Sequence, residues 1–351
     1  MTDIGDHGGW PAILTELTQG RDLSSQAARA ALGTVLEGDA TDAQLAAFIV
    51  ALRMKGESVA EISGMVDAML DNAAPLELPE GVIDIVGTGG SAMRRRAALS
   101  VSTMSCFVAS AAGASVAKHG NVGASSTSGS FDTLSALGVT TGLDGPGVRL
   151  CVEEAGLGFV YAKAFHPAMR FAGPVRSQLA IPTVFNLLGP LSHPGRVLRQ
   201  LIGVSDAAMQ DRVAATFAAR GSRHSWVVHG SGLDELTLTG PTRIVEVRDG
   251  ELSGDFVIEP SDFSLETVTE EAIAGGGPQD NARIALEIFA GTDTGARRDI
   301  VALNSGAALV VAGLAADLAE GIGLAMDTLS SGAVLDKLEA VKAVSARAGG
   351  A

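Results

Sequence analysis

Two glycine-rich segments of the sequence have the composition of anion-binding loops. The segment GTGG at 87–90 directly follows a β-branched run, and glycines at such a turn let backbone N–H groups converge on an anion. The segment KHGN at 118–121, followed by SSTSG at 125–129, supplies an ammonium group, an imidazole, an amide and hydroxyls. Polar groups this dense would be costly to bury without a ligand. Either segment alone is also compatible with a tight turn or a solvated loop.

An arginine and a carboxylate pair supply two further functions. Arg176 lies in a proline-punctuated segment, and its guanidinium could bind a carboxylate through two parallel hydrogen bonds. Asp234 and Glu235 follow a strand pattern that ends at Gly230, where adjacent carboxylates suit Mg²⁺, a hard ion that shares its remaining ligands with substrate phosphates. A surface arginine and a solvated acidic pair are the alternatives for each motif alone. Together, the four segments describe a site for a diphosphorylated sugar and an acidic acceptor.

The elements that must position these groups alternate between strand and helix patterns from residue 77 onward. Such alternation predicts an α/β fold with a mainly parallel central sheet flanked by helices. The dipeptide Asp249-Gly250 between two alternating runs predicts a hairpin that adds an antiparallel element. After Gly277 the sequence is typical of helices, interrupted at 291–295.

The first 76 residues have a different pattern. Capping-box signatures, Thr41 with Gln44 and Ser58 with Glu61, precede runs with apolar residues at helical spacing. The sequence therefore predicts a small helical domain at 1–76 beside a large α/β domain.

Composition narrows the class of protein. The chain has 351 residues, and its net charge of −15 disfavours nucleic-acid binding. Cys106 and Cys151 lie among apolar residues, as expected of buried, reduced thiols. No signal-peptide pattern opens the sequence, and the longest apolar run, around 302–316, is too short to span a bilayer. We therefore expect a cytoplasmic protein with no nucleic-acid or membrane partner.

Seven motifs in fixed order give the chain a family resemblance from about residue 10 to residue 340. They are DIVGTGG, VAKHGN, SSTSG, FHPAMR, GPVRSQL, FNLLGPL and LDELT. In this order and spacing the sequence resembles the anthranilate phosphoribosyltransferases. The resemblance implies Mg²⁺-dependent transfer of a phosphoribosyl group from phosphoribosyl pyrophosphate to the amine of anthranilate, in tryptophan biosynthesis. It also implies a homodimer formed through the helical domain, and a division in which 166–190 joins the helical domain while 77–165 and 191–351 form the α/β domain.

Site residues predicted from this resemblance and from the chain's own glycine loop fall into three sets, and no catalytic acid or base is assigned. The donor set is Gly87, Thr88, Gly90, Ser91, Arg94, Arg95, Arg96, Ser100, Ser102, Thr103, Lys118, Ser126 and Ser128. The acceptor set is His119, Gly120, Asn121, His166 and Arg176, with Arg176 nearest the carboxylate of the amine. The metal set is Ser102, Asp234 and Glu235.

The chain departs from the family pattern on the donor side. The family's glycine loop continues GTGGDG, whereas here Ser91 replaces the aspartate and the loop is about three residues longer, with Arg94–Arg96 inside it. Ser100 replaces an asparagine, and Val122 replaces an arginine. We expect the three arginines either to contact the donor's phosphates or to form a solvated loop.

Alternative functions differ in the acceptor or in class. One alternative is a paralogous phosphoribosyltransferase or a nucleoside phosphorylase with another aromatic acceptor. A second is a non-catalytic relative that binds nucleic acid, against which the acidic charge speaks. The complete FHPAM and PVR motifs favour an aromatic amino acid as the acceptor.

Overall fold

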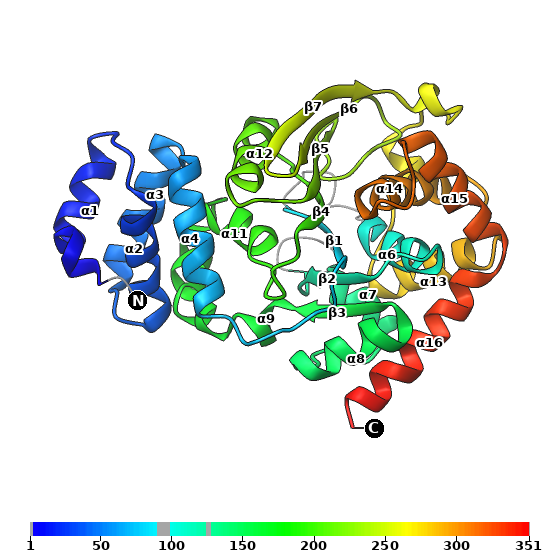
Figure 1. Ribbon diagram of the computed structural model, residues 1–351, viewed down its shortest axis with the longest axis horizontal. Helices are drawn as coiled ribbons and strands as arrows, with labels where there is room; N and C mark the ends of the chain where they lie inside the picture. Colours follow the sequence, from blue (N-terminus) through cyan, green and yellow to red (C-terminus); the bar gives the residue numbers. More distant parts are fainter. Residues whose placement is uncertain (1–2, 90–98, 124–127, 351) are drawn as a thin grey trace.

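The computed structural model describes residues 3–89, 99–123 and 128–350. A helical unit lies at one side of a larger α/β unit (Figure 1). The helical unit contains η1 (Ile4–His7), α1 (Gly9–Thr18), α2 (Ser25–Glu37), α3 (Asp42–Lys55) and α4 (Val59–Asp71). Both predicted capping boxes are present at the starts of α3 and α4, and they satisfy backbone N–H groups that a helix start leaves unpaired.

A seven-stranded sheet forms the centre of the α/β unit, in the order β3-β2-β1-β4-β5-β6-β7. The strands are β1 (Ile83–Gly87), β2 (Val116–Gly120), β3 (Leu157–Tyr161), β4 (Arg199–Gly203), β5 (His224–Gly230), β6 (Thr242–Arg248) and β7 (Glu251–Ile258). The first five in this order are parallel, and β6 and β7 are antiparallel. Asp249 and Gly250 join β6 to β7 with φ angles of 49° and 79°, the left-handed geometry of a tight hairpin. The predicted fold class and hairpin are confirmed.

Helices cover both faces of this sheet. The longer helices are α6 (Val101–Ala111), α8 (Gly145–Ala155), α12 (Gln210–Ala219), α13 (Pro278–Phe289), α14 (Ala296–Ala312), α15 (Leu318–Ser330) and α16 (Ala333–Ala348). The shorter ones are α7 (Ser130–Ala136), α9 (Ala162–Phe165), η2 (Pro167–Phe171), α10 (Gly173–Leu179), α11 (Phe185–Leu191), η3 (Ala207–Met209), η4 (Pro260–Phe263) and η5 (Glu270–Ile273). Among the described residues, no helix is both long enough and apolar enough to cross a bilayer.

Two hydrophobic cores lie on opposite faces of the sheet, because alternate strand residues point to opposite sides. Ile85 packs in the core that contains α6 and α14. Its neighbour Val86 packs in the core that contains α12, α11 and the helical unit. The helical unit therefore shares a continuous core with one sheet face.

The strand order reverses between β1 and β4, since β2 and β3 lie on one side of this pair and β5 on the other. In open parallel sheets, ligands bind beyond the carboxyl ends of the strands at such a switch point. The segments that follow β1, β2 and β5 all lie at this edge of the sheet, so the fold gathers three of the four polar motifs.

Candidate active site

A cavity of about 620 Å³ lies at the carboxyl ends of β1 and β2, and residues of α9, α10 and α11 line it. All five predicted acceptor residues line this cavity, together with two of the donor set: His119, Gly120, Asn121, His166, Arg176, Gly87 and Thr88. The acceptor residues come from segments far apart in the sequence. The fold therefore brings the predicted acceptor set together.

Positive charge distinguishes this cavity from the rest of the molecule. Lys163, Arg170 and Arg176 line it, and no Asp or Glu is among its described lining residues. The whole chain carries a net charge of −15. A cationic cavity in an acidic protein favours an anionic ligand.

Arg176 is the most constrained of these three cations. It lies half-buried on α10, with its guanidinium carbon 5.0 Å from the ring centroid of Phe185. Burial lowers its pKa from the usual value. Within the described ranges no acidic side chain forms an ion pair with it, so its fork of donors is available to a carboxylate from outside the protein.

Two buried imidazoles belong to the predicted acceptor set. The rings of His119 and His166 have centroids 5.3 Å apart, and the side chains are 2 % and 4 % exposed. Burial, with a smaller effect from neighbouring histidines, lowers the pKa of His119 well below its ordinary value. Burial likewise lowers the pKa of His166 to about 4. Both rings are therefore neutral near pH 7, and Nε2 of His119 has no hydrogen-bond partner among the described residues.

The carboxylate pair lies beside the glycine turn of β1. Asp234 and Glu235 are 1 % and 6 % exposed, and Oδ2 of Asp234 accepts a hydrogen bond of 2.7 Å from the N–H of Gly89. A Cβ on Gly87 would lie 2.2 Å from the same oxygen, so glycine is required for this approach. Two motifs that lie 145 residues apart in the sequence are thus in direct contact in space.

This pair fits a divalent cation such as Mg²⁺ in its chemistry. Both groups offer carboxylate oxygens at the switch point of the sheet, which are the ligands that this ion prefers. No group of three or more His, Cys, Asp or Glu side chains that could hold a metal exists among the described residues. An ion here would therefore complete its coordination with water, hydroxyl groups or the ligand's phosphates.

Four further residues of the predicted donor set, Ser100, Ser102, Thr103 and Ser128, lie around the start of α6 and outside the lining of the main cavity. Ser100 precedes the helix and shares a hydrogen bond of 2.8 Å with Thr133, which also contacts Ser128 Oγ at 3.1 Å. Ser102 is half-buried on the first turn. Thr103 is 1 % exposed, and its hydroxyl has no hydrogen-bond partner in the described part of the chain.

Lys118 is the buried cation of the donor set, with an exposed fraction of 2 %. Its Nζ donates a hydrogen bond of 2.5 Å to the carbonyl of Ile85. Six other donor residues lie outside the described residues: Gly90, Ser91, Arg94, Arg95, Arg96 and Ser126.

Sequence reasoning missed several residues that line the cavity. Lys163 and Arg170 add positive charge, and Asn186 adds an amide whose Oδ1 accepts a hydrogen bond from Thr183 N at 3.0 Å. Arg170 and Asn186 stand inside the FHPAMR and FNLLGPL motifs, so membership of a motif was the available signal. Lys163 carried no comparable signal.

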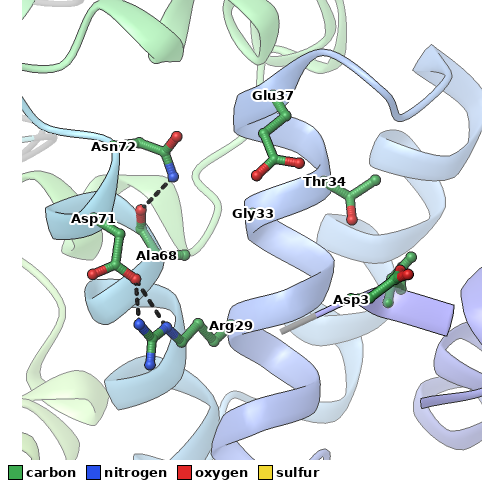
Figure 2. A pocket seen from close by; sticks show the side chains of 9 residues that line it. Asp3, Arg29, Gly33, Thr34, Glu37, Ala68, Asp71 and Asn72 are labelled. Atoms are coloured by element: carbon green, nitrogen blue, oxygen red, sulfur yellow. Dashed lines mark hydrogen bonds and ion pairs between the residues drawn. The ribbon is translucent and has the colours of Figure 1, made fainter. Parts of the chain in front are cut away.

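A second hollow of about 310 Å³ on the helical unit has the opposite electrostatic character (Figure 2). Its guanidinium, Arg29, is ion-paired with Asp71 at 2.6 Å, and Asp3 and Glu37 add further carboxylates. An anionic substrate is therefore disfavoured there, in contrast to the cavity beside β1 and β2.

Comparisons with known proteins agree with this geometry. Residues 11–73 match the model described as "Glycosyl transferase family, helical bundle domain", and residues 79–335 match "Glycosyl transferase family, a/b domain". The anthranilate phosphoribosyltransferase of Roseiflexus castenholzii is 44 % identical over 333 residues, covering 95 % of this chain and 97 % of that protein.

Two solved structures extend the comparison to three dimensions. The anthranilate phosphoribosyltransferase of Thermus thermophilus superposes with a TM-score of 0.89 at 38 % identity, over 95 % of this chain and 99 % of that one. The Saccharomyces cerevisiae enzyme in complex with PRPP and Mg gives 0.86 at 28 % identity, over 96 % and 98 % of the two chains. This chain therefore belongs to the anthranilate phosphoribosyltransferase family.

Proposed function

We propose that the protein transfers the phosphoribosyl group from phosphoribosyl pyrophosphate to the amine of anthranilate and releases pyrophosphate, a step of tryptophan biosynthesis. The observation that carries this proposal is the cationic cavity with Arg176 at its wall in a protein of net charge −15. Family membership and the anthranilate phosphoribosyltransferase activity of the relatives support the same reaction.

On the acceptor side, Arg176 binds the carboxylate of anthranilate through two parallel hydrogen bonds. Because the imidazoles of His119 and His166 are neutral, they add no charge that would compete with the guanidinium. Gly120 and Asn121 complete the wall beside the amine. The Nε2 lone pair of His119 can accept one N–H of the amine and thereby orient the nitrogen lone pair.

On the donor side, the glycine turn after β1, the start of α6 and Lys118 bind the phosphates, and the N–H groups of the turn and helix point their partial positive charge at them. Asp234 and Glu235, with Ser102, would hold Mg²⁺. That ion, when bound, neutralises charge on the departing pyrophosphate. A yeast relative in complex with PRPP and Mg supports this part of the proposal.

The transfer needs little covalent chemistry from the protein. The bond from C1 of the ribose to the pyrophosphate oxygen breaks, C1 gains oxocarbenium character, and the amine nitrogen attacks C1. The amine then loses one proton, which water or the released pyrophosphate can accept. The protein contributes by aligning the amine with C1 and by excluding water that would otherwise hydrolyse the donor.

The domain division and assembly extend this proposal. Segment 166–190 is assigned to the helical domain, which α10 and α11 support by packing against α3 and α4. Opening and closing between 1–76 and the α/β domain would then admit substrates. We also propose a homodimer formed through the helical domain and a cytoplasmic location, consistent with two buried free cysteines among the described residues. Light scattering on the purified protein tests the dimer.

The decisive experiment mixes purified protein with phosphoribosyl pyrophosphate, Mg²⁺ and anthranilate, and follows the loss of anthranilate fluorescence. Loss that requires all three components supports the proposal. Turnover of a nucleoside with phosphate, without turnover of anthranilate, would instead identify a nucleoside phosphorylase.

A further inference from the structure

The parallel ladder between β1 and β2 is much shorter than its neighbours. These strands pair only at Ile83 and Val116, whereas β2 pairs with β3 over five residues and β1 pairs with β4 over five. Beyond Ile83 the two strands therefore separate, and they do so toward the carboxyl ends that form the active site.

Side chains occupy the backbone groups that a continued ladder would use. Nε2 of His193 lies 2.9 Å from the carbonyl oxygen of Ala117, and the N–H of His119 donates to Oδ1 of Asp84 at 3.0 Å. Lys118 Nζ donates to the carbonyl of Ile85. All of these groups are buried, where an unpaired backbone N–H or C=O group is costly. Each side-chain hydrogen bond therefore takes the place of a ladder hydrogen bond that the separated strands do not make.

The tautomer and charge of the His193 imidazole follow from its two hydrogen bonds. Its Nδ1 accepts a hydrogen bond of 3.0 Å from the N–H of Gly195, so this nitrogen carries no proton. The proton must then be on Nε2, which donates it to Ala117. His193 is thus a neutral imidazole whose orientation is set at both nitrogens.

His193 also contacts the acceptor side directly. Its ring lies edge-on to that of His119, with centroids 5.7 Å apart and an interplanar angle of 65°. His193 does not line the cavity, whereas His119 does. One side chain therefore fixes the strand residue two positions before His119 and also packs against the His119 ring.

We propose that His193 is a positioning residue for the transfer reaction: by occupying the Ala117 carbonyl in the gap between β1 and β2, it keeps the strands apart and sets the orientation of His119 in the acceptor cavity. This inference rests on the proposed function for its kinetic test. Without His193, the Ala117 carbonyl would be left unpaired, and the most accessible replacement is closure of β2 toward β1, which would move His119.

The test compares three substitutions by their geometry. His193→Leu removes both hydrogen bonds, His193→Asn keeps an amide near the Nδ1 position, and His193→Gln keeps a donor that reaches toward Ala117. We expect His193→Leu to raise the KM for anthranilate at least about tenfold, about 1.4 kcal/mol, with the KM for phosphoribosyl pyrophosphate changed less than about threefold. The KM of His193→Asn for anthranilate should resemble that of His193→Leu, and the KM of His193→Gln should stay within about threefold of the wild-type value.

A double-mutant cycle separates positioning from a general loss of stability. In a His119→Ala background, His193→Leu should change the anthranilate KM less than about twofold, because the residue through which it acts is absent. His224→Leu is the matched control: this buried histidine bonds Glu246 on β6, and we expect a lower melting temperature with an unchanged KM.

Nitrogen NMR of the six histidines gives a readout that does not require activity. The His119 ring resonances should move in His193→Leu and His193→Asn, and should stay in place in His193→Gln and His224→Leu. An additive effect in the cycle, or unchanged His119 resonances in both disruptive variants, would overturn the inference. A wild-type enzyme that does not consume anthranilate would overturn the proposed function alone, since the NMR result stands apart from it.

Discussion

Replacing Arg176 by alanine perturbs the group on which acceptor recognition rests in this proposal. A hydrogen bond to a charged group contributes about 1.5–3 kcal/mol, and a fork of two would give more in a dry site. Because Arg176 is only half-buried, water offsets part of that gain. We therefore expect a total loss of about 1.5–3 kcal/mol, which raises the KM for anthranilate roughly 10- to 150-fold.

The assay follows anthranilate fluorescence at saturating phosphoribosyl pyrophosphate and Mg²⁺, and a second titration measures the donor. The donor KM should change less than about twofold, because the interaction removed belongs to the acceptor. Arg170→Ala is the matched control. Its guanidinium carbon lies 4.4 Å from the ring centroid of Phe171, and it also lines the cavity. We expect less than about a threefold effect there.

Aniline isolates the carboxylate, since it retains the amine but lacks the acidic group. Any turnover of aniline should be equal in the wild type and in Arg176→Ala, because the lost interaction has no partner in this acceptor. The assignment is refuted if Arg176→Ala weakens the donor and leaves anthranilate binding intact, which would place this arginine on the phosphate side.

Three further predictions concern metal, donor and pH. Asp234→Asn with Glu235→Gln should abolish Mg²⁺-dependent turnover while changing the melting temperature little, and near-normal activity at ordinary Mg²⁺ would contradict the metal assignment. Replacing Arg94–Arg96 by alanine should raise the donor KM at least about tenfold and flatten its salt dependence, whereas an unchanged KM would identify a solvated loop. The pKa of His166 falls from 6.5 to about 4 on folding, so the folded state favours the neutral ring, and its stabilising contribution is complete above pH 6.5 and is lost as pH falls toward 4. Urea unfolding at pH 7 and pH 5 should show this loss in the wild type and a smaller one in His166→Gln.

The sequence predicted the fold well wherever a structural feature depends only on residues close together in the chain. The capping boxes at Thr41 and Ser58 need only residues three positions apart, and both are present. The Asp249-Gly250 turn needs two residues that tolerate positive φ, and it too is present. The alternation of strand and helix patterns then sufficed for the parallel sheet.

The site was predictable only as a set of motifs. The contact between Gly89 and Asp234 joins positions 145 residues apart, and no local pattern specifies it. His193 had no chemical motif of its own, because its role depends on the gap that β1 and β2 leave between them. Lys163 carries no motif, and its place in the cavity wall depends on how α9 packs. Such features depend on packing between distant segments, which spacing along the chain does not encode.

The alternation of side chains along β2 explains how one strand could serve both substrates of the proposed reaction. Successive residues of a strand point to opposite sides, so Lys118 and His119 cannot face the same ligand group. Burial raises the pKa of the Cys106 thiol in α6 to about 12, and the Lys118 ammonium opposes this rise. Lys118 therefore acts toward the predicted phosphate-binding helix, and its Nζ donates to the carbonyl of Ile85, which packs in the core that contains α6. His119 lines the acceptor cavity on the other side. In the proposed function, the donor and acceptor groups would therefore meet across the end of β2, and this strand would set how they are placed relative to one another.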